Sequence, residues 1–162
     1  MRVNGRLAAV FAAGLLVSAC AGSSNMVVMP NESTFRSPTV ALVYGGATVQ
    51  AQDEGVTELK EYMEKAFFEK GLFSKGDGLT VKYGFMTYDE GSQAARYFLG
   101  GIGGGEAKMV VGAEFYDKSG KLLAKIQSEG RLNGGFFGGD SSSAIKKAAQ
   151  EVADYAKANF AP

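Results

Sequence analysis

The segment from residue 107 to residue 129 constrains the fold most strongly. It holds two runs in which apolar residues alternate with others, residues 107–116 and 121–129, separated by the four residues Asp117–Gly120. Strict alternation is typical of a strand with one buried face. The order Asp-Lys-Ser-Gly suits a type I turn, in which Asp and Gly are favoured at the two ends. The segment is therefore predicted to be an antiparallel β-hairpin.

The expected register of this hairpin follows from a four-residue turn. Phe115 would lie opposite Leu122, and the apolar residues of both strands would share one face. On the other face Lys108 would lie opposite Glu129, which is a favourable cross-strand pair. The sequence thus predicts both the buried face and one ion pair.

Four further segments carry periodic apolar patterns. Residues 40–44 form a short apolar run, and residues 79–86 alternate like a half-buried strand. Residues 56–67 and 145–156 repeat their apolar positions at three and four, as amphipathic helices do. Asp53 is placed to cap the first helix, and Gly71 to end it in the left-handed conformation. Together these patterns predict an α+β domain of two layers, in which one mainly antiparallel sheet of about four strands carries two main helices on one face.

Residues 1–19 have the parts of a lipoprotein signal peptide. Arg2 and Arg6 precede an apolar run over residues 7–17, and small residues then lead into Cys20. As a helix this run would span about 16 Å, which is too short to cross a bilayer. The stretch Leu-Val-Ser-Ala-Cys that ends at Cys20 resembles a bacterial lipobox, in which the cysteine is lipidated and becomes the first residue of the mature protein. The alternative is an ordinary signal peptide that happens to contain a cysteine.

The lipobox resemblance implies an address and a domain layout. Cys20 would carry acyl chains such as palmitate, and two or more chains anchor a protein stably in its membrane. Ala21 follows the cysteine, where many inner-membrane lipoproteins have aspartate, so the expected location is the periplasmic side of the outer membrane. Residues 20–37 show no sustained period and are predicted to form a flexible tether that reaches at most about 55 Å. Residues 38–162 would form a single globular domain.

The amino acids that the chain lacks exclude several kinds of active site. With no histidine and one cysteine, it cannot use a histidine base, a histidine-containing metal site or an intrachain disulfide. Its 17 basic and 17 acidic residues give no net field that would attract nucleic acid. Ser143 and Lys146 match the S-x-x-K pattern of a hydrolase, but the partner motifs S-D-N and K-T-G are missing. We therefore expect no enzyme activity, no cofactor and no metal.

Two glycine-rich stretches, residues 100–105 and 134–139, stand out in the second half of the chain. The first lacks the G-x-G-x-x-G spacing and precedes a predicted strand, which argues against a nucleotide loop. Ile102, Phe136 and Phe137 are large apolar residues set among these glycines. They either fill the core or form an exposed contact patch, and we favour the contact patch because loops carry function more often than the framework does.

Several short motifs occur in a characteristic linear order. Gly91-Ser92 is followed by Ala95-Arg96-Tyr97, the first glycine-rich stretch, Ser119-Gly120-Lys121 and the second glycine-rich stretch. This combination resembles the domain of unknown function 4410 family of small bacterial lipoproteins. That family has no agreed activity, ligand or site. The resemblance therefore implies a fold and a membrane address but transfers no functional residues.

Two functions lead at this point, and an envelope hydrolase that uses Ser143 and Lys146 is kept as a third. The first is a non-enzymatic accessory or scaffold in the cell envelope, attached to the membrane through Cys20 and acting on an envelope protein partner. The second is a binding module for a hydrophobic or envelope-derived ligand, held in a groove between the sheet and the helices. A hydrophobic cavity of more than about 300 Å³ would favour the second.

Overall fold

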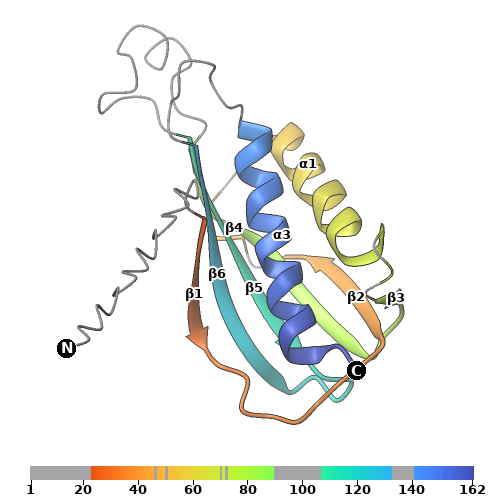
Figure 1. Cartoon of the computed structure of the whole chain (residues 1–162). Coiled ribbons are helices and arrows are strands. Elements are labelled where there is room, and N and C mark those ends of the chain that lie inside the picture. Colours follow the sequence, from red (N-terminus) through yellow and green to blue (C-terminus); the bar gives the residue numbers. More distant parts are fainter. Residues whose placement is uncertain are drawn as a thin grey trace, which may run out of the picture.

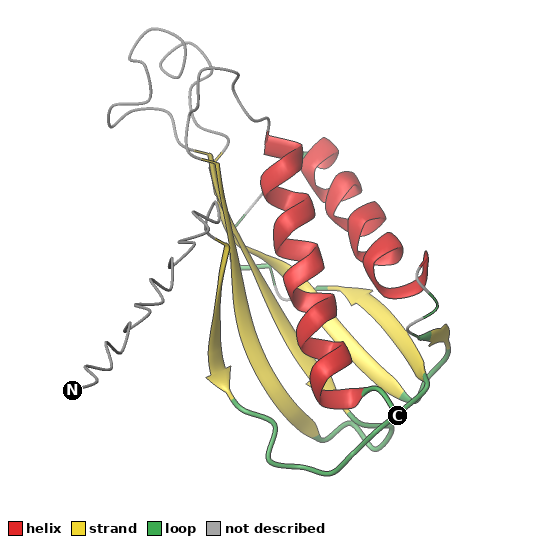
Figure 2. Cartoon of the chain, in the orientation of Figure 1, coloured by secondary structure: helices red, strands yellow, loops and turns green. Residues whose placement is uncertain are grey.

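The computed structural model describes residues 23–45, 47–49, 51–69, 71, 73–89, 107–132 and 141–162. These residues form a two-layer domain, a six-stranded sheet with its helices on one face (Figures 1 and 2). The strands are β1 (Ser23–Met29), β2 (Thr39–Tyr44), β3 (Ser74–Lys75), β4 (Leu79–Asp89), β5 (Ala107–Tyr116) and β6 (Leu122–Leu132). The helices are α1 (Asp53–Glu64), which continues into the π-helical turn η1 (Lys65–Glu69), and α3 (Ser141–Phe160).

The predicted α+β class is confirmed, but the sheet has more strands and is more mixed than predicted. Its strand order is β1-β6-β5-β4-β2-β3. The pairs β1–β6, β6–β5 and β5–β4 are antiparallel. β2 is parallel to both β4 and β3. The parallel pairing arises because α1 and η1 lie between β2 and the next strands, and a helical crossover returns the chain in the same direction.

β1 corrects the prediction of a flexible tether over residues 20–37. Seven of those residues form a strand that pairs with β6, from Ser23 opposite Gly130 to Met29 opposite Lys125. The run Met26–Met29 is apolar at every position, so it shows no period of two. A search for alternation therefore misses this edge strand, although its composition favours a strand.

The hairpin of β5 and β6 forms as predicted, but its register is shifted by two residues. Gly120 has a φ of 84° and closes a tighter loop in which the Asp117 amide donates to the Lys121 carbonyl at 3.0 Å. A bulge then leaves Phe115 opposite Ala124, whereas Leu122 had been expected there. Each irregularity moves the register by one residue, so together they restore the predicted buried face.

The predicted register position of Lys108 opposite Glu129 is wrong for the same reason. Lys108 lies opposite Arg131 in the shifted register, and Glu129 lies opposite Val110. Another cross-strand ion pair of the hairpin joins Glu114 and Lys125, with 2.8 Å between Oε1 and Nζ. A register prediction from alternation thus identifies the face but not the individual partners.

The helices bury the stripes that the sequence predicts. Leu59, Met63 and Phe67 of α1 and η1 are buried, and Gly71 follows with a φ of 63°. Asp53 is the first helical residue and not the cap, since Gln52 occupies the cap position without a side-chain bond. Asp53 still lies in the first turn, where a carboxylate is favourable to the helix dipole.

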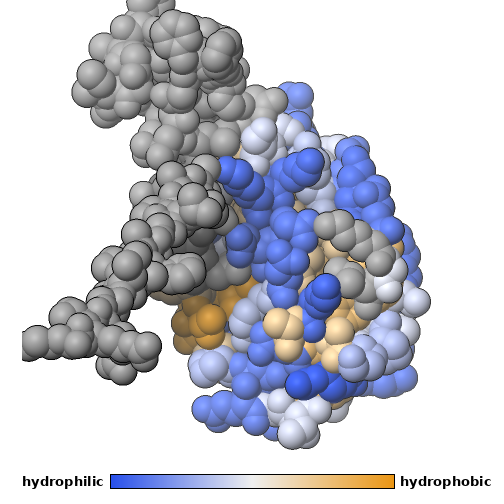
Figure 3. Space-filling model, viewed as in Figure 1, coloured by the Kyte–Doolittle hydropathy of each residue, from blue (hydrophilic) through white to orange (hydrophobic). Residues whose placement is uncertain are grey.

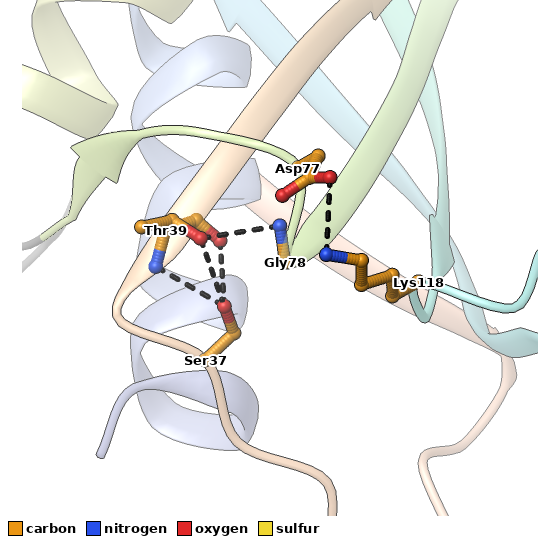
Figure 4. A network of polar contacts seen from close by, with 5 residues as sticks. All are labelled: Ser37, Thr39, Asp77, Gly78 and Lys118. Carbon is orange, nitrogen blue, oxygen red and sulfur yellow. Dashed lines mark hydrogen bonds and ion pairs between the residues drawn. The ribbon is translucent and has the colours of Figure 1, made fainter.

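The C-terminus is part of the core. Phe160 is fully buried and stacks on Phe115, with 5.1 Å between the ring centroids. Its carbonyl accepts a hydrogen bond of 2.9 Å from the Ser37 amide, which joins the end of α3 to the start of β2. Ser37 also bonds the backbone of Thr39, and the Thr39 hydroxyl accepts from the Gly78 amide at 3.1 Å (Figure 4). A side chain at Gly78 would collide with the Ser37 hydroxyl, so this junction requires glycine.

Candidate functional site

The residues that the sequence analysis selected as sites lie outside the described part of the chain. Cys20, Ile102, Phe136 and Phe137 all fall in ranges for which the structure gives no placement. The lipid anchor and the glycine-flanked contact patch therefore remain predictions. The described residues form other surfaces that are candidate sites.

The Ser143 and Lys146 pair lies on the exposed side of the first turns of α3. The neighbouring Ser142 hydroxyl is within 2.7 Å of the Tyr62 hydroxyl, a contact that links α3 to α1. An activated serine needs a base held close to it in a sheltered site. Two exposed side chains on a helix surface do not provide that shelter.

The interior holds no obvious acid or base for catalysis among the described residues. Burial raises the pKa of Tyr83 to about 12, and the nearby Glu64 carboxylate adds to this shift. The phenol therefore stays protonated at neutral pH and packs edge-on against Tyr44, with 5.7 Å between centroids. In the same described ranges, no group of three or more Cys, Asp or Glu side chains is placed to hold a metal ion.

The sheet face opposite the helices is polar at its centre. The Glu114 carboxylate accepts hydrogen bonds from Lys125 and, at 2.7 Å, from the Tyr116 hydroxyl. These bonds, that of Lys125 first, hold the pKa of Glu114 below its usual value. Lys82 lies on the next strand, opposite Glu114 in the register. A sheet with one packed face and one charged face is typical of a solvated surface.

The most unusual surface is the free edge of β1. β1 pairs with β6 on one side, and no described strand pairs with its other side. Met26, Val27 and Val28 are 57%, 47% and 48% exposed. In Figure 3 apolar residues show at the left, where β1 runs in Figure 1, while hydrophilic residues dominate the helical face. We call the three residues Met26, Val27 and Val28 the β1 edge.

The β1 edge presents apolar side chains on both faces of the sheet. Val27 lies opposite Ile126, whose side chain is buried on the helical face, and Met26 lies opposite Gln127 on the other face. Free edges in soluble proteins are normally protected by charges, by proline or by a covering segment. The β1 edge has no charge in these three positions. Its composition is that of a contact surface.

The opposite edge of the sheet is only partly covered. β3 pairs with β2 at Thr39 and Val40 alone, and no described strand pairs with the outer side of β2 beyond that point. Val43 is 44% exposed there. Lys60 lies over the ring of the neighbouring Tyr44, at 5.1 Å from its centroid. Both sheet edges therefore offer backbone groups and an apolar side chain.

A groove adjoins the C-terminal end of β1. It has a volume of about 430 Å³. Its lining residues are Met29, Pro30, Glu32, Ser33, Lys121, Leu122 and Leu123. The groove lies between the segment after β1 and the start of β6, not between the sheet and the helices as the ligand-binding hypothesis expects. It is continuous with the β1 edge through Met29.

Sequence reasoning missed the β1 edge because it assigned residues 20–37 to a tether. The signal that identifies the strand is the unbroken run Met26–Met29, which is too apolar for a solvated linker. In a fully buried strand such a run is ordinary. At an exposed sheet edge it indicates a partner.

Comparisons with known proteins agree with this fold. A family model described as a domain of unknown function (DUF4410) matches residues 49–133, more than half of the chain. Among solved structures, the PelC dodecamer from Paraburkholderia phytofirmans is similar with a TM-score of 0.62 and 10% sequence identity, covering 87% of this chain and 99% of that chain. A dodecamer of a PelC variant from the same organism gives a TM-score of 0.57 at 11% identity, covering 83% and 97%. No curated protein matches the sequence.

Proposed function

The chain belongs to the DUF4410 family, and from that premise we propose that it is a lipid-anchored protein of the bacterial cell envelope that binds other proteins and catalyses no reaction. Cys20 carries the lipid, and the domain lies on the periplasmic side of the outer membrane as an accessory or scaffold. The observation that carries the scaffold role is the β1 edge, with three exposed apolar residues on a strand whose outer side no described strand pairs with.

The physical argument concerns the cost of leaving such an edge in water. An unpaired strand offers a row of N–H and C=O groups to any extended chain that approaches it. Apolar side chains on both faces add area that gains free energy when a partner covers it, at about 25 cal/mol per Å². The same two features in one strand favour a protein partner over a small molecule.

The partner that we propose first is a second copy of this chain. PelC, which shares the fold, is found as a dodecamer. A contact between different surfaces of successive copies builds a ring when its rotation closes. The β1 edge supplies one such surface, and the outer side of β2 near Val43 supplies a different one.

The test compares the molar mass of the full-length chain in mild detergent with that of two variants. Met26→Lys combined with Val28→Lys places charges on the β1 edge and should reduce the assembly to monomers, with the melting temperature nearly unchanged. Ala158→Lys, on the exposed side of α3, adds the same kind of charge away from the edge and should leave the assembly intact. A monomeric wild type, or an edge variant with the wild-type mass, would contradict the proposal.

The groove supports a second candidate function, the binding of a hydrophobic or envelope-derived ligand. Its volume of about 430 Å³ lies in the range typical of small-molecule sites. Met29, Leu122 and Leu123 supply apolar lining, and Glu32 and Lys121 supply one charge of each sign. Binding of a lipophilic fluorescent probe that is lost in Leu123→Lys but kept in Ala158→Lys would support this function. Equal probe binding by all three proteins would exclude it.

A further inference from the structure

The two borders of the sheet run in opposite directions. β1 lies at one border, and β2 with β3 lies at the other (Figure 1). Each strand from β1 through β6 and β5 to β4 is antiparallel to the one before it, so β1 and β4 run in opposite directions. β2 is parallel to β4 and therefore also runs opposite to β1. In a ring whose axis follows the strands, rotation keeps the direction of every strand. β1 of one copy would therefore meet β2 of the next copy as an antiparallel neighbour.

The register places the free parts of the two borders at the same height. One row of residues that lie opposite one another runs across the sheet through Met29, Lys125, Glu114, Lys82 and Val43. The last residue of β1 and the exposed Val43 are therefore level with each other. Rotation about an axis along the strands also keeps the height of each residue. The β1 edge of one copy would then lie beside the outer side of β2 in the next copy.

Exposed apolar residues are concentrated on the same two borders. Five large apolar side chains are exposed in the part of the chain that the structure describes, and four of them are the β1 edge and Val43. Apolar residues at an unpaired strand edge gain free energy when a neighbouring strand covers them. One contact between the two borders would cover all four.

Toward the start of β2, the two borders have complementary outlines. β1 ends at Met29, because Pro30 has no N–H with which to continue the ladder. β6 extends past that point, and the groove lies beside Leu122. The row of Leu122 ends at Ala41 on the opposite border, and the preceding residue of β2, Val40, pairs with β3. One border thus lacks a strand at nearly the same height at which the other border has an additional one.

From these outlines we propose that β3 of one copy occupies the groove of the next copy, while the β1 edge pairs antiparallel with the outer side of β2. We call this contact the joint. The inference rests on the proposed self-assembly and deepens it, since it specifies which surfaces meet, in which direction and at which height. The occupant of the groove is then a second copy of this chain.

The charges on the two surfaces agree with the joint. The groove carries Glu32 and Lys121, one charge of each sign. β3 carries Lys75, which forms an exposed ion pair with Glu64 at the end of α1. Exposed ion pairs contribute little to stability, so Lys75 can take a new partner at low cost. Lys75 of one copy and Glu32 of the next form a complementary pair across the joint, and such pairs fix the register of a contact.

The test is crosslinking between cysteines introduced on the two sides of the joint, in the full-length chain in mild detergent. Leu122→Cys places a thiol in the groove, and Lys75→Cys places one in β3. β6 and β3 are four positions apart in one sheet, about 19 Å, so a short bismaleimide links these thiols only between copies. We expect the double variant to form covalent dimers, trimers and larger species. Their yield should be several-fold above that of either single variant.

Two controls accompany the double variant. Leu122→Cys combined with Ala158→Cys, on the exposed side of α3, should stay at the background of the wild type, which shares Cys20 with every variant. Val28→Cys combined with Val43→Cys reports on the strand-pairing part of the joint and should give the same series of covalent species.

The mass of each protein before crosslinking separates the possible failures. Background crosslinking of both double variants, in proteins that assemble like the wild type, would overturn the joint, leave the self-assembly standing and assign the groove to another occupant. Covalent dimers from Leu122→Cys alone would indicate a two-fold contact and would also overturn the joint. A monomeric wild type would contradict the self-assembly and the joint together.

Discussion

Phe160 offers a sharp test of the packing, because it is the third residue from the C-terminus and yet fully buried. Chain ends usually fray, and truncating them usually costs little. Here the ring stacks on Phe115 at 5.1 Å and meets Tyr155 edge-on at 6.3 Å. Phe160→Ala removes a whole buried ring, for which about 3 to 5 kcal/mol of stability is typical. That is a large part of the roughly 5 to 15 kcal/mol available to a domain.

The assay is thermal and urea unfolding, both followed by circular dichroism, on the chain expressed from Ala21 onward. We expect the melting temperature of Phe160→Ala to fall by roughly 10 °C or more. The double variant with Phe115→Ala should show coupling of about 0.5 to 1.5 kcal/mol, since the two rings contact each other. Lys157→Ala, exposed in the last turn of the same helix, should cost less than about 0.5 kcal/mol. A Phe160→Ala protein as stable as Lys157→Ala would refute the assignment of the C-terminus to the core.

Cys20, Ser128 and Glu114 can each be tested by one substitution. Metabolic labelling with a radioactive fatty acid should mark the wild type, whereas Cys20→Ser should stay unprocessed and unlabelled; equal labelling of both would exclude lipidation at this residue. The Ser128 hydroxyl is buried without a hydrogen-bond partner among the described residues. Ser128→Ala should therefore stabilise the domain by about 1 kcal/mol or leave it unchanged. If urea unfolding shows that the variant is less stable by more than about 1 kcal/mol, the hydroxyl is hydrogen-bonded in the protein. The pKa of Glu114 is lower in the folded protein than its unfolded value near 4.5. This difference contributes stability that is complete above the unfolded value and is lost as the pH falls through the folded value. Glu114→Gln should therefore lose less stability than the wild type between about pH 5 and pH 3, and parallel pH profiles of the two proteins would contradict this.

The hairpin shows how far alternation alone can predict structure. The faces of β5 and β6 follow from the sequence, because a period of two assigns every second residue to one side. The partners do not, because the left-handed Gly120 and the bulge between Phe115 and Tyr116 each shift the register by one residue. A turn type and a bulge depend on the local backbone conformation, which a binary pattern of apolar and polar residues does not contain.

The order of the strands in the sheet could not be predicted from the sequence, for a different reason. Residues 40–44 are predictable as a strand, but nothing in a single short run says whether its neighbours are parallel or antiparallel. The crossover through α1 and η1 decides it by returning the chain to β4 in the same direction as β2. For the function, the count of zero histidines is enough to exclude histidine chemistry. The exposed β1 edge is apparent only from the strand order, which places β1 at the border of the sheet.

The direction of β1 also bears on how the proposed anchor would hold the domain. An anchor at Cys20 pulls on Ser23, at the end of β1, and therefore along the strand axis. β1 is bonded to β6 at six register positions between Ser23 and Met29, and the two strands are antiparallel. A pull along the axis loads these bonds together, whereas a pull across the sheet would break them one after another. If the proposed anchor holds, a load applied at Cys20 would therefore be shared along the β1–β6 ladder, which resists separation better than a load across the sheet would allow.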